Sequence, residues 1–481
     1  MYFNPLLMTD GYKLGHREQY PEGTTLVMSN FTARGTRRAE GDKVVFFGLQ
    51  YLLRKYLVDQ WGLFFKIDKR VVVQEYYMII RQYLNNPHID VSHIEALHDL
   101  GYLPIEIWAL PEGTVHEYRV PSLVIYNTHP SFAWLTNYLE TIISCTLWPM
   151  CTTATTAYHA KKKLIEWAEK TTDYDRNNII SFVDYAAHDF SMRGMFGLEA
   201  SAMAASAHAI FNSGSDGLCA IDFLRMYYDQ VGPSIHSIPA SEHSVMCCNG
   251  ASGELETIKR LLTEVYPDQP VSIVSDSYDY FNVIENYARE LKDIICNRQA
   301  MTIFRPDSGD PMEIIPRSLE ILWDIYGGSI VPCNGKEFKI IDPIVGLIWG
   351  DGIRIADADP LFQKMADMGF SSVNLHLGVG SYTYQYVTRD TDNYAIKTTY
   401  AEINGRSVNI KKEPKTDSGM KHSATGITAV YVSNGKYVLV ENATWEQFKH
   451  CELKRVFSNS RIIKVTDFNE VRSIANRDFH K

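Results

Sequence analysis

The chain has 481 residues, of which 45% are hydrophobic and 22% are charged, a balance typical of a globular protein with room for two domains. The formal net charge of −10 disfavours a nucleic-acid surface, so a site for a polyanion must draw its positive field from a few arginines, helix N-termini or a metal ion. No basic segment leads into an apolar core at the N-terminus, and no window approaches the roughly 20 apolar residues that span a bilayer, so we expect neither export nor a membrane location.

The eight cysteines form no CxxC pair and have no His-x-x-x-His partner. This pattern argues against a zinc site and against a disulfide framework. It is typical of a reduced, cytoplasmic protein, and it predicts no metal held by protein ligands alone.

The N-terminal third mixes short apolar runs with helical patterns. Residues 44–49 predict a strand that leads into a helix, and residues 105–115 predict a strand and a turn. Residues 132–148 carry apolar side chains at helical spacing. Residues 152–170 begin with threonines suited to capping and continue as an amphipathic helix, in which Lys161 to Lys163 are expected on the solvated face. We therefore expect an irregular α+β arrangement up to about residue 148.

The middle third repeats one pattern, in which a short apolar run ends in a polar, glycine-containing loop and most such loops lead into a helix. These runs lie within residues 179–194, 234–244, 271–279, 301–311, 345–352 and 372–381. Strands that alternate with helices imply parallel pairing with crossover helices, as in a barrel or a doubly wound sheet.

Polar side chains follow the expected carboxyl end of each of these runs. The loops after the carboxyl ends of parallel strands share one face, and that face holds the active site. The residues at these ends are His188, Asp189, Arg193, Glu242, His243, Asp276, Ser277, Arg305, Asp307, Ser308, Gly350, Asp351 and Gly380. Because they come from six loops, they converge only if the strands pair in parallel.

These residue types suit a phosphorylated sugar. Arg193, Arg305 and the later Arg389 carry guanidinium groups that match phosphate oxygens. Glycines such as Gly350 and Gly380 let backbone amides approach an anion. The aspartates of the set can hold ribose hydroxyls or Mg²⁺, which prefers oxygen ligands. A phosphorylated ribose combines all three requirements.

Eight different short motifs also follow one another along the chain. They are TDGYKLGHREQYP (9–21), FFGLQYLLRKYL (46–57), HDFSMRG (188–194), PASEHS (239–244), VSIVSDSYDYFN (271–282), IFRPDSGDP (303–311), WGDG (349–352) and VTRD (387–390). Together they resemble the motifs of the nicotinamide phosphoribosyltransferase family, among the type II phosphoribosyltransferases, from about residue 8 to residue 430. The resemblance implies that the phosphoribosyl group of phosphoribosyl pyrophosphate passes to nicotinamide, which gives nicotinamide mononucleotide and pyrophosphate in NAD salvage.

The same resemblance implies a fold and partners. We expect an α/β protein with an incomplete or irregular TIM-like barrel over residues 149–389. A second, α+β domain is expected from residues 1–148 and 390–481, and it contributes to the interface of a homodimer with shared active sites. The implied cofactors are Mg²⁺, bound with pyrophosphate or phosphoribosyl pyrophosphate, and ATP as a co-substrate. The implied enzyme is cytoplasmic and has small-molecule partners only, with no nucleic acid and no membrane.

Recognition of the base is assigned by this resemblance. Phe190 is expected to stack on the pyridine ring, with Tyr12 of the other subunit on the opposite face. Arg305 is expected to contact both the ring amide and the phosphoribosyl group. Asp216 matches an acidic residue near the carboxamide, where it accepts from the amide but repels nicotinate by about 4 kcal/mol at about 4 Å and an effective dielectric near about 20.

The remaining substrate contacts are also carried over from the family. The substrate-binding set expected in this way comprises Tyr12, Phe190, Arg193, Asp216, Asp276, Ser277, Gly350, Asp351, Gly380, Ser381, Arg389, Arg34, Lys397 and Lys412. Ser381 replaces a glycine of the family pattern, and a lysine expected at residue 420 stands one place later as Lys421. Arg34 and Lys397 match basic positions contributed across the dimer.

The expected catalytic residues are His243, Glu242, Asp307 and Arg305. The family passes a phosphoryl group from ATP to a histidine at the position of His243, and the adjacent Glu242 is expected to orient the imidazole. Since displacement at the anomeric carbon needs little proton transfer, catalysis should consist mainly of positioning and electrostatic stabilisation. Two alternatives remain open, namely a nicotinate phosphoribosyltransferase and a non-catalytic nucleotide-binding homologue.

Overall fold

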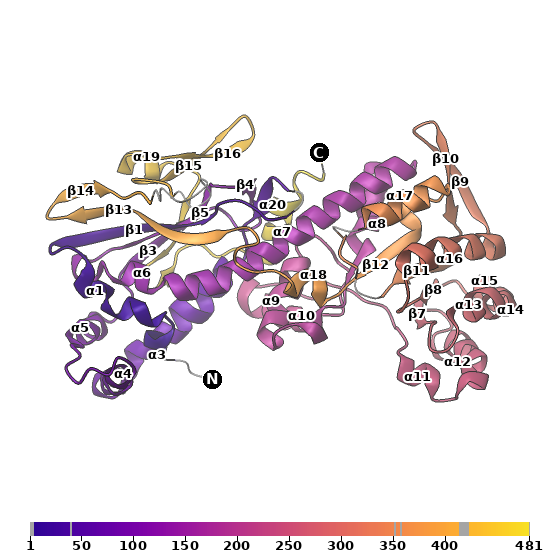
Figure 1. The fold of residues 1–481 in the computed structure, drawn as a ribbon, viewed down its shortest axis with the longest axis horizontal. Coiled ribbons are helices and arrows are strands. Elements are labelled where there is room, and N and C mark those ends of the chain that lie inside the picture. Colours follow the sequence, from indigo (N-terminus) through magenta and orange to yellow (C-terminus); the bar gives the residue numbers. More distant parts are fainter. Residues whose placement is uncertain (1–3, 39–40, 351–352, 356–357, 413–422, 481) are drawn as a thin grey trace. The chain divides into compact units, whose positions relative to one another are not determined.

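The computed structural model describes residues 4–38, 41–350, 353–355, 358–412 and 423–480. The chain divides into two compact units, whose elements are labelled in Figure 1. Unit 1 comprises Met1–Thr155, Leu224–Val231 and Val387–Ala475, and unit 2 comprises Thr156–Phe223, Gly232–Tyr386 and Asn476–Lys481.

These bounds differ from the expected ones. The expected boundary after residue 148 lies inside a single helix, α7 (Glu140–Thr171), which contains Pro149. A proline inside a helix removes one backbone hydrogen bond but does not always end the helix, so two expected helices are one. In addition, residues 224–231 belong to unit 1 and residues 476–481 to unit 2, which local patterns did not indicate.

Unit 1 is built on an antiparallel sheet with the strand order β14-β13-β1-β5-β3-β17-β18. The strands of this unit are β1 (Thr24–Ala33), β2 (Lys43–Val45), β3 (Ile105–Ala109), β4 (Val115–Glu117), β5 (Pro121–Asn127), β13 (Tyr394–Ile403), β14 (Arg406–Asn409), β15 (Ala429–Ser433), β16 (Lys436–Val440), β17 (Lys454–Ser458) and β18 (Arg461–Ile462). The pair β1 and β13 joins segments more than 360 residues apart, since Ala33 pairs with Tyr394 and Thr24 with Ile403, and the two strands lie side by side in Figure 1.

Burial along the strands follows the pairing. In β3 the buried residues alternate, with Ile105, Ile107 and Ala109 inside, as expected of an antiparallel strand that packs on one face. On the neighbouring strands the Phe31 and Tyr394 rings stack at 4.9 Å between centroids and 10° between planes. Alternate side chains of β3 thus face the core of unit 1, whereas β1 and β5 in the same sheet are buried along most of their length.

Helices cover this core. They are α1 (His16–Gln19), α2 (Leu49–Tyr51), α3 (Trp61–Lys66), α4 (Lys69–Tyr83), α5 (Ser92–Leu100), α6 (Leu135–Tyr138), α19 (Trp445–Lys449) and α20 (Phe468–Asn476), with a π-helical segment (Leu52–Gln60) between α2 and α3. The helix expected after residue 49 is therefore present and continues to Lys66.

Unit 2 contains the predicted parallel sheet, with the strand order β6-β12-β11-β8-β7. Its strands are β6 (Ala187–Asp189), β7 (Val271–Val274), β8 (Thr302–Arg305), β11 (Val345–Trp349) and β12 (Leu375–Val379), and a separate hairpin is formed by β9 (Gly328–Cys333) and β10 (Lys336–Ile341). All residues of β7 are buried, as expected of a parallel strand covered on both faces.

Isolated bridges extend the pairing beyond both edge strands. These parallel bridges are Asp189↔Ser215, Gly214↔His236 and Ala240↔Ser272. The run expected at residues 234–244 is therefore not a regular strand, but two of its residues pair as a strand would. The pairing continues from β6 toward β7 through these irregular segments.

The expected strand at residues 179–194 is mostly wrong. Residues Arg176–Ala186 form α8, and only Ala187–Asp189 are extended. Asp175 caps the helix by accepting from the Asn178 backbone N–H, and the buried positions fall at helical spacing. The short apolar run had hidden this period.

The helices of unit 2 surround the parallel sheet. They are α8 (Arg176–Ala186), α9 (Leu198–His208), α11 (His243–Cys247), α12 (Glu254–Arg260), α13 (Tyr280–Asn282), α14 (Ala288–Glu290), α15 (Lys292–Asn297), α16 (Pro311–Tyr326), α17 (Asp359–Asp367) and α18 (Ser381–Gln385). A further helix, α10 (Cys219–Tyr228), begins in unit 2 and continues into unit 1 from Leu224. Within α7, Lys161 is 2% exposed and donates to Asp184 Oδ1 (2.5 Å) and the Phe211 carbonyl (2.8 Å), so its expected place on a solvated face is wrong.

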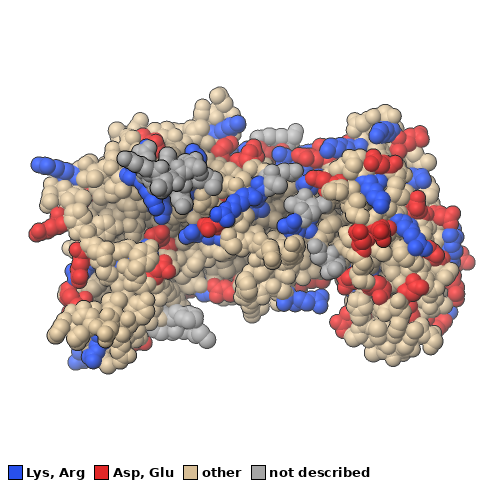
Figure 2. Space-filling model, viewed as in Figure 1, with Lys and Arg blue, Asp and Glu red and all other residues tan. Residues whose placement is uncertain are grey.

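Three features of the structure relate to the expected absence of a nucleic-acid surface, a membrane span and disulfide bonds. On the face shown in Figure 2, acidic and basic side chains lie interspersed. Within the described ranges, no helix combines the length and hydropathy needed to cross a bilayer. The eight cysteines are all free thiols.

A buried carboxylate caps the helical stretch that begins at Leu49. Glu112 Oε1 accepts from the backbone N–H groups of Gly48 and Leu49, each at 2.6 Å, and from the Tyr228 hydroxyl at 2.9 Å. Its Oε2 accepts from the Gln50 N–H at 3.2 Å. Burial raises the pKa of Glu112 to about 7, although these hydrogen bonds lower it.

This pKa gives a stability that depends on pH. Because the folded protein binds the Glu112 proton more tightly than the unfolded chain, the free energy of unfolding should fall by about 3 kcal/mol as pH rises from about 4.5 to 7. Glu112→Gln cannot titrate, so the difference in urea midpoint between the native protein and this variant should change across that interval. A difference that stays constant with pH would contradict the prediction.

Candidate active site

The aromatic wall of the site begins where β6 ends. Phe190 donates its backbone N–H to the Val379 carbonyl at 2.9 Å, which holds it beside β12. A Cβ on Gly378 would lie 2.7 Å from Cδ2 of Phe190 and 2.8 Å from the Trp349 carbonyl oxygen. The Phe190 ring therefore packs where the strand has no side chain, and the His188 ring lies 4.8 Å from it at 43°.

Asp216 stands next to this wall with one oxygen fully engaged. Its Oδ1 accepts from His188 Nε2 at 3.1 Å and from Ser237 Oγ at 2.5 Å. Oδ2 makes no hydrogen bond to any described residue. Burial raises the pKa of Asp216, but the bonds from His188 and Ser237 and the charge of Arg305 outweigh burial, so the pKa lies below its ordinary value. Asp216 is thus an ionised carboxylate with a free acceptor.

A second carboxylate fixes the backbone around Asp216. Asp189 is buried, and its Oδ1 accepts from the Ser191 N–H at 2.9 Å while Oδ2 accepts from Ser215 Oγ at 3.1 Å. Its carbonyl also accepts from the Asp216 N–H at 3.0 Å. Asp189, expected at this edge from the sequence, is therefore an anchor between two loops.

Arg305 is the last residue of β8 and supplies the central positive charge. Its Nη2 donates to the Ser241 carbonyl at 2.7 Å, while Nε is buried without a partner among the described residues. Burial lowers the pKa of Arg305, opposed mainly by the charges of Asp307 and Asp216, and the positive charge of Arg193 lowers it further. A guanidinium remains charged under these conditions, and its unpaired donor suits an anionic ligand.

Asp276, in the loop that follows β7, contacts both the loop that follows β8 and the first residue of α11. Its Oδ1 contacts His243 Nε2 at 3.1 Å, and its Oδ2 accepts from the Asp307 N–H at 3.2 Å and from Ser308 Oγ at 2.5 Å. The Asp276 side chain is 7% exposed, whereas that of His243 is 49% exposed. The imidazole is therefore anchored at one nitrogen and open to solvent elsewhere.

The partner of His243 differs from the expected one. Glu242 was expected to orient the imidazole, but its carboxylate accepts from the Ser244 hydroxyl instead. Glu242 precedes the first turn of α11 in an extended conformation, so successive side chains diverge there. Asp276, which is far away in the sequence, takes the orienting position.

The remaining predicted residues of unit 2 lie on the same edge of the sheet. A Cβ on Gly350 would lie 2.1 Å from Oδ1 of Asp307, so the bare backbone there makes room for that carboxylate. The Asp307 carboxylate accepts no hydrogen bond from the described residues. Ser277 Oγ is buried without a partner among them. Asp351, expected beside Gly350, lies outside the described residues.

The turn that carries Arg193 approaches the start of α18. A Cβ on Gly194 would lie 2.1 Å from Ser381 Oγ, whereas a Cβ on Gly380 would meet nothing within 4 Å. A side chain at residue 194 would therefore clash with Ser381, whereas residue 380 has room for one. Arg193 is exposed, and Ser381 is half-buried at the first position of α18.

Four predicted basic residues gather separately, in unit 1. Lys397 lies on β13, and its pKa is lowered by burial, opposed by Glu140, and lowered further by the charges of Arg34, Lys412 and Arg389. Repulsion of this kind among cations indicates a concentrated positive field. We refer to Arg34, Lys397, Lys412 and Arg389 as the basic cluster; Lys421 lies outside the described residues.

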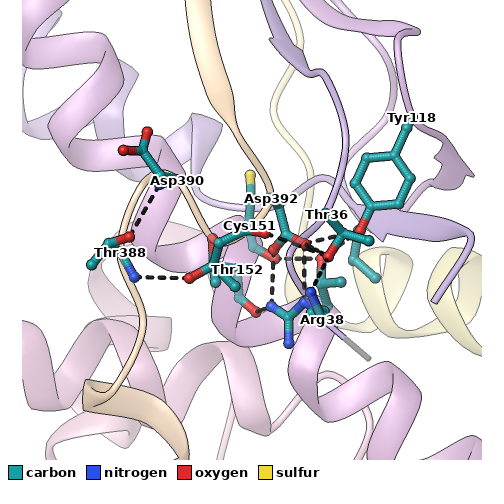
Figure 3. A network of polar contacts seen from close by, with 11 residues as sticks. Thr36, Arg38, Tyr118, Cys151, Thr152, Thr388, Asp390 and Asp392 are labelled. Carbon is teal, nitrogen blue, oxygen red and sulfur yellow. Dashed lines mark hydrogen bonds and ion pairs between the residues drawn. The ribbon is translucent and has the colours of Figure 1, made fainter. Parts of the chain in front are cut away.

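A buried ion pair holds the loop that carries Arg389, as Figure 3 shows. Asp392 accepts from Nε and Nη2 of Arg38 at 3.0 and 2.9 Å, and also from the Tyr118 hydroxyl at 2.9 Å and Thr36 Oγ1 at 3.2 Å. Burial lowers the pKa of Arg38, but the hydrogen bond to Asp392 and the charges of Asp392, Tyr118 and Tyr394 together outweigh burial, so the pKa is raised. The two partners are more than 350 residues apart, and no sequence pattern connects them.

Tyr12, the remaining predicted residue, also belongs to unit 1. It lies in a 3-10 segment (Gly11–Gly15) and is 65% exposed. Its ring contacts His16 at 5.1 Å and lies 5.0 Å from Lys13 Nζ. The Tyr12 side chain is thus an accessible aromatic ring.

Behind Phe190 and Arg305 a cavity of about 170 Å³ enters the parallel sheet. Its lining also includes Tyr185, His188, Asp216, His236, Ser237, Ile238, Ala240, Ser272, Ile303, Ile348 and His376. Sequence reasoning did not single out Ser237 or the apolar lining. Ser237 could have been found, because it stands in a run already selected for its polar end.

Two family models match the chain. The family model described as "Nicotinate phosphoribosyltransferase (NAPRTase) family" matches residues 185–461. The model described as "Nicotinamide phosphoribosyltransferase, N-terminal domain" matches residues 4–107.

Curated relatives match over most of their length. The nicotinamide phosphoribosyltransferase of Acinetobacter baylyi is 41% identical over 494 residues, covering 98% of this chain and 96% of the relative. That of Mycoplasma pneumoniae is 32% identical and covers 86% of this chain and 92% of the relative. Among solved structures, a nicotinate-nucleotide pyrophosphorylase from Pyrococcus furiosus shares the fold at a TM-score of 0.59 and 15% identity, over 99% of this chain and 97% of the other.

Together with the family match, a parallel α/β unit whose strand ends carry arginines and aspartates identifies a phosphoribosyltransferase, and the chain belongs to the nicotinate phosphoribosyltransferase family. Within that family it belongs with the nicotinamide phosphoribosyltransferases. The family membership expected from the motifs is therefore confirmed.

The close packing at Gly378 predicts that any side chain at this position displaces the Phe190 ring. Gly378→Ala would place a methyl group 2.7 Å from the ring and 2.8 Å from a carbonyl oxygen, so the ring has to move. We expect the KM for the pyridine substrate to rise about fivefold, because a misplaced ring loses stacking worth about 1 kcal/mol. Gly62→Ala in α3, where an added Cβ would meet nothing within 4 Å, is the matched control, and equal KM values for the two variants would contradict this packing.

Proposed function

We propose that the site transfers the phosphoribosyl group of phosphoribosyl pyrophosphate to nicotinamide, giving nicotinamide mononucleotide and pyrophosphate for NAD salvage. One observation carries this choice of base. Asp216 is an ionised carboxylate beside Phe190, with Oδ1 occupied by His188 and Ser237 and with Oδ2 free. A free carboxylate oxygen accepts from a carboxamide NH₂ and repels the carboxylate of nicotinate.

The transfer step follows from the charges at the rim. As the bond from the anomeric carbon to pyrophosphate breaks, the ribose gains oxocarbenium character and the pyridine nitrogen supplies the electron pair of the new bond. Arg305 and Arg193 stabilise the leaving charge. Because these groups are positioned before the reaction, they lower the barrier without a large reorganisation.

Bound Mg²⁺ would neutralise part of the pyrophosphate charge. The residues fit such an ion when it arrives with the substrate. Asp307 offers a half-buried carboxylate with no described partner, and carboxylate plus phosphate oxygens are the ligands that Mg²⁺ prefers. Among the residues that the structure describes, no cluster of three or more protein ligands could hold a metal alone.

ATP is proposed to act through His243. Since His243 Nε2 faces the Asp276 carboxylate at 3.1 Å, the neutral imidazole carries its proton there and keeps its lone pair on Nδ1. In the proposed step Nδ1 bonds to the γ-phosphorus of ATP as the bond to the bridging oxygen breaks, and ADP leaves. The orienting acid in this proposal is Asp276, not Glu242.

We also propose that the protein is a cytoplasmic homodimer and that both subunits contribute residues to each active site. An exposed Tyr12 ring suits the second face of a base that stacks on Phe190. The basic cluster of unit 1 suits the phosphate groups of a substrate. We further propose that the parallel strands of unit 2 and the bridges that extend them form an incomplete barrel.

One assay tests the reaction. The protein is incubated with phosphoribosyl pyrophosphate, Mg²⁺ and either nicotinamide or nicotinate, and the product is identified by mass. We expect nicotinamide mononucleotide, with nicotinate disfavoured by at least about a hundredfold from the repulsion at Asp216. Asp216→Asn should reduce that preference. Nicotinate mononucleotide as the main product would show that the protein is a nicotinate phosphoribosyltransferase. The absence of any product would support a non-catalytic nucleotide-binding protein.

A second assay tests the phosphohistidine. The protein treated with γ-labelled ATP should acquire an acid-labile, base-stable label, and ATP should stimulate nicotinamide mononucleotide formation. His243→Ala should lose the label and the stimulation while retaining part of the transfer made without ATP. Asp276→Asn should slow labelling at least about tenfold, because the imidazole loses its charged orienting partner. Undiminished stimulation in His243→Ala would remove this proposal.

A further inference from the structure

A buried histidine outside the site bridges two of its walls. His208, the last residue of α9, is fully buried. Its Nδ1 lies 2.5 Å from the Tyr384 hydroxyl and its Nε2 lies 3.0 Å from the Gly214 carbonyl oxygen. Burial lowers the pKa of His208, so the ring is neutral. Since a carbonyl can only accept, Nε2 donates to Gly214, and Nδ1 accepts from the Tyr384 hydroxyl.

Gly214 in turn supports the base-binding groups. It lies two residues before Asp216, and a Cβ placed on it would lie 2.8 Å from His188 Nδ1. Its carbonyl oxygen also accepts from the Asp189 N–H at 3.1 Å. His188 is therefore bound to Asp216 and packed against Gly214, so a shift of this segment moves both groups that face the carboxamide.

Tyr384 belongs to α18, which contacts the anion side of the site. Ser381 of the same helix lies against Gly194, next to Arg193. Gln385 Oε1 accepts from the Phe196 N–H at 2.9 Å. The hydroxyl of Tyr384 thus connects the turn that carries Arg193 with the segment that carries Asp216, through a single imidazole.

We propose that His208 and Tyr384 are positioning residues that set the preference for nicotinamide, because they hold Gly214 and with it the Asp216 carboxylate in place. The proposal rests on the proposed function, since it concerns how that site selects its base. Neither residue touches the substrate. An unpaired polar group in this interior would be costly, so the buried hydrogen bonds of His208 are kept. A shift of Tyr384 or of Gly214 therefore moves the other.

The test compares two conservative variants with a matched control. Tyr384→Phe removes only the hydroxyl, and His208→Gln keeps a donor but cannot reach both partners. Tyr326→Phe is the control, since Tyr326 of α16 loses a hydroxyl that donates to the Ala288 carbonyl of α14 at 2.9 Å, away from the predicted site. For each protein kcat/KM is measured with nicotinamide and with nicotinate, and Tm is recorded.

The ratio of the two kcat/KM values is the decisive readout. We expect it to fall at least about tenfold in Tyr384→Phe and in His208→Gln, with no change in Tyr326→Phe. The double variant should lose no more than His208→Gln alone, because both changes break one connection. A merely structural role would lower both rates by the same factor and leave the ratio unchanged.

The outcomes separate this inference from the proposed function. If the native protein forms nicotinamide mononucleotide but the ratio is unchanged in both variants, the positioning role is wrong and the proposed function stands. If the native protein forms no mononucleotide, the proposed function fails first. Should His208→Gln not fold, Tyr384→Phe decides alone, since loss of one buried hydroxyl leaves the packing in place.

Discussion

The site depends on the parallel hydrogen bonding of β6, β12, β11, β8 and β7. Parallel pairing brings the carboxyl ends of all these strands to one edge, whatever their separation in the sequence. Arg305 ends β8 and Asp276 follows β7 by two residues, so pairing β7 with β8 sets both next to the same space. Antiparallel pairing of any one strand would send its polar end to the opposite edge.

Buried carboxylates then fix the loops beyond those ends. Asp276 in unit 2 and Asp392 in unit 1 each accept hydrogen bonds from two other chain segments, and Asp189 accepts from its own loop and from Ser215 in a second segment. One carboxylate can accept several donors at once, and each charge-assisted bond contributes more than a neutral one. Loops without regular secondary structure thereby hold polar side chains in one geometry, as electrostatic catalysis requires.

Charge is distributed locally rather than over the whole protein. The chain carries −10 net, yet Arg305 and Arg193 face the rim of unit 2, and the basic cluster gives unit 1 a positive field of its own. Asp216 remains ionised within this setting because His188 and Ser237 donate to it. Selection of a neutral carboxamide and attraction of a polyanion can therefore operate in one acidic protein.

Much of unit 2 could be predicted because its strands are short apolar runs with polar ends. The runs that became β7, β8, β11 and β12 were found in this way, whereas residues 179–186 were misread because a short apolar run does not separate helix from strand. Lys161 was misplaced for a related reason, since a lysine on an amphipathic helix usually faces water. Neither error changed which polar residues were predicted to follow the carboxyl ends of the strands.

The sequence by itself determined the family, the parallel class of unit 2 and which residue types reach its active edge, because motif order and hydrophobic period are local properties. Tertiary structure alone decided that Asp276 rather than Glu242 holds His243, that Arg38 pairs with Asp392, and that His208 connects Tyr384 to Gly214. These contacts join distant segments. They depend on strand register and on side-chain direction, which no local pattern encodes.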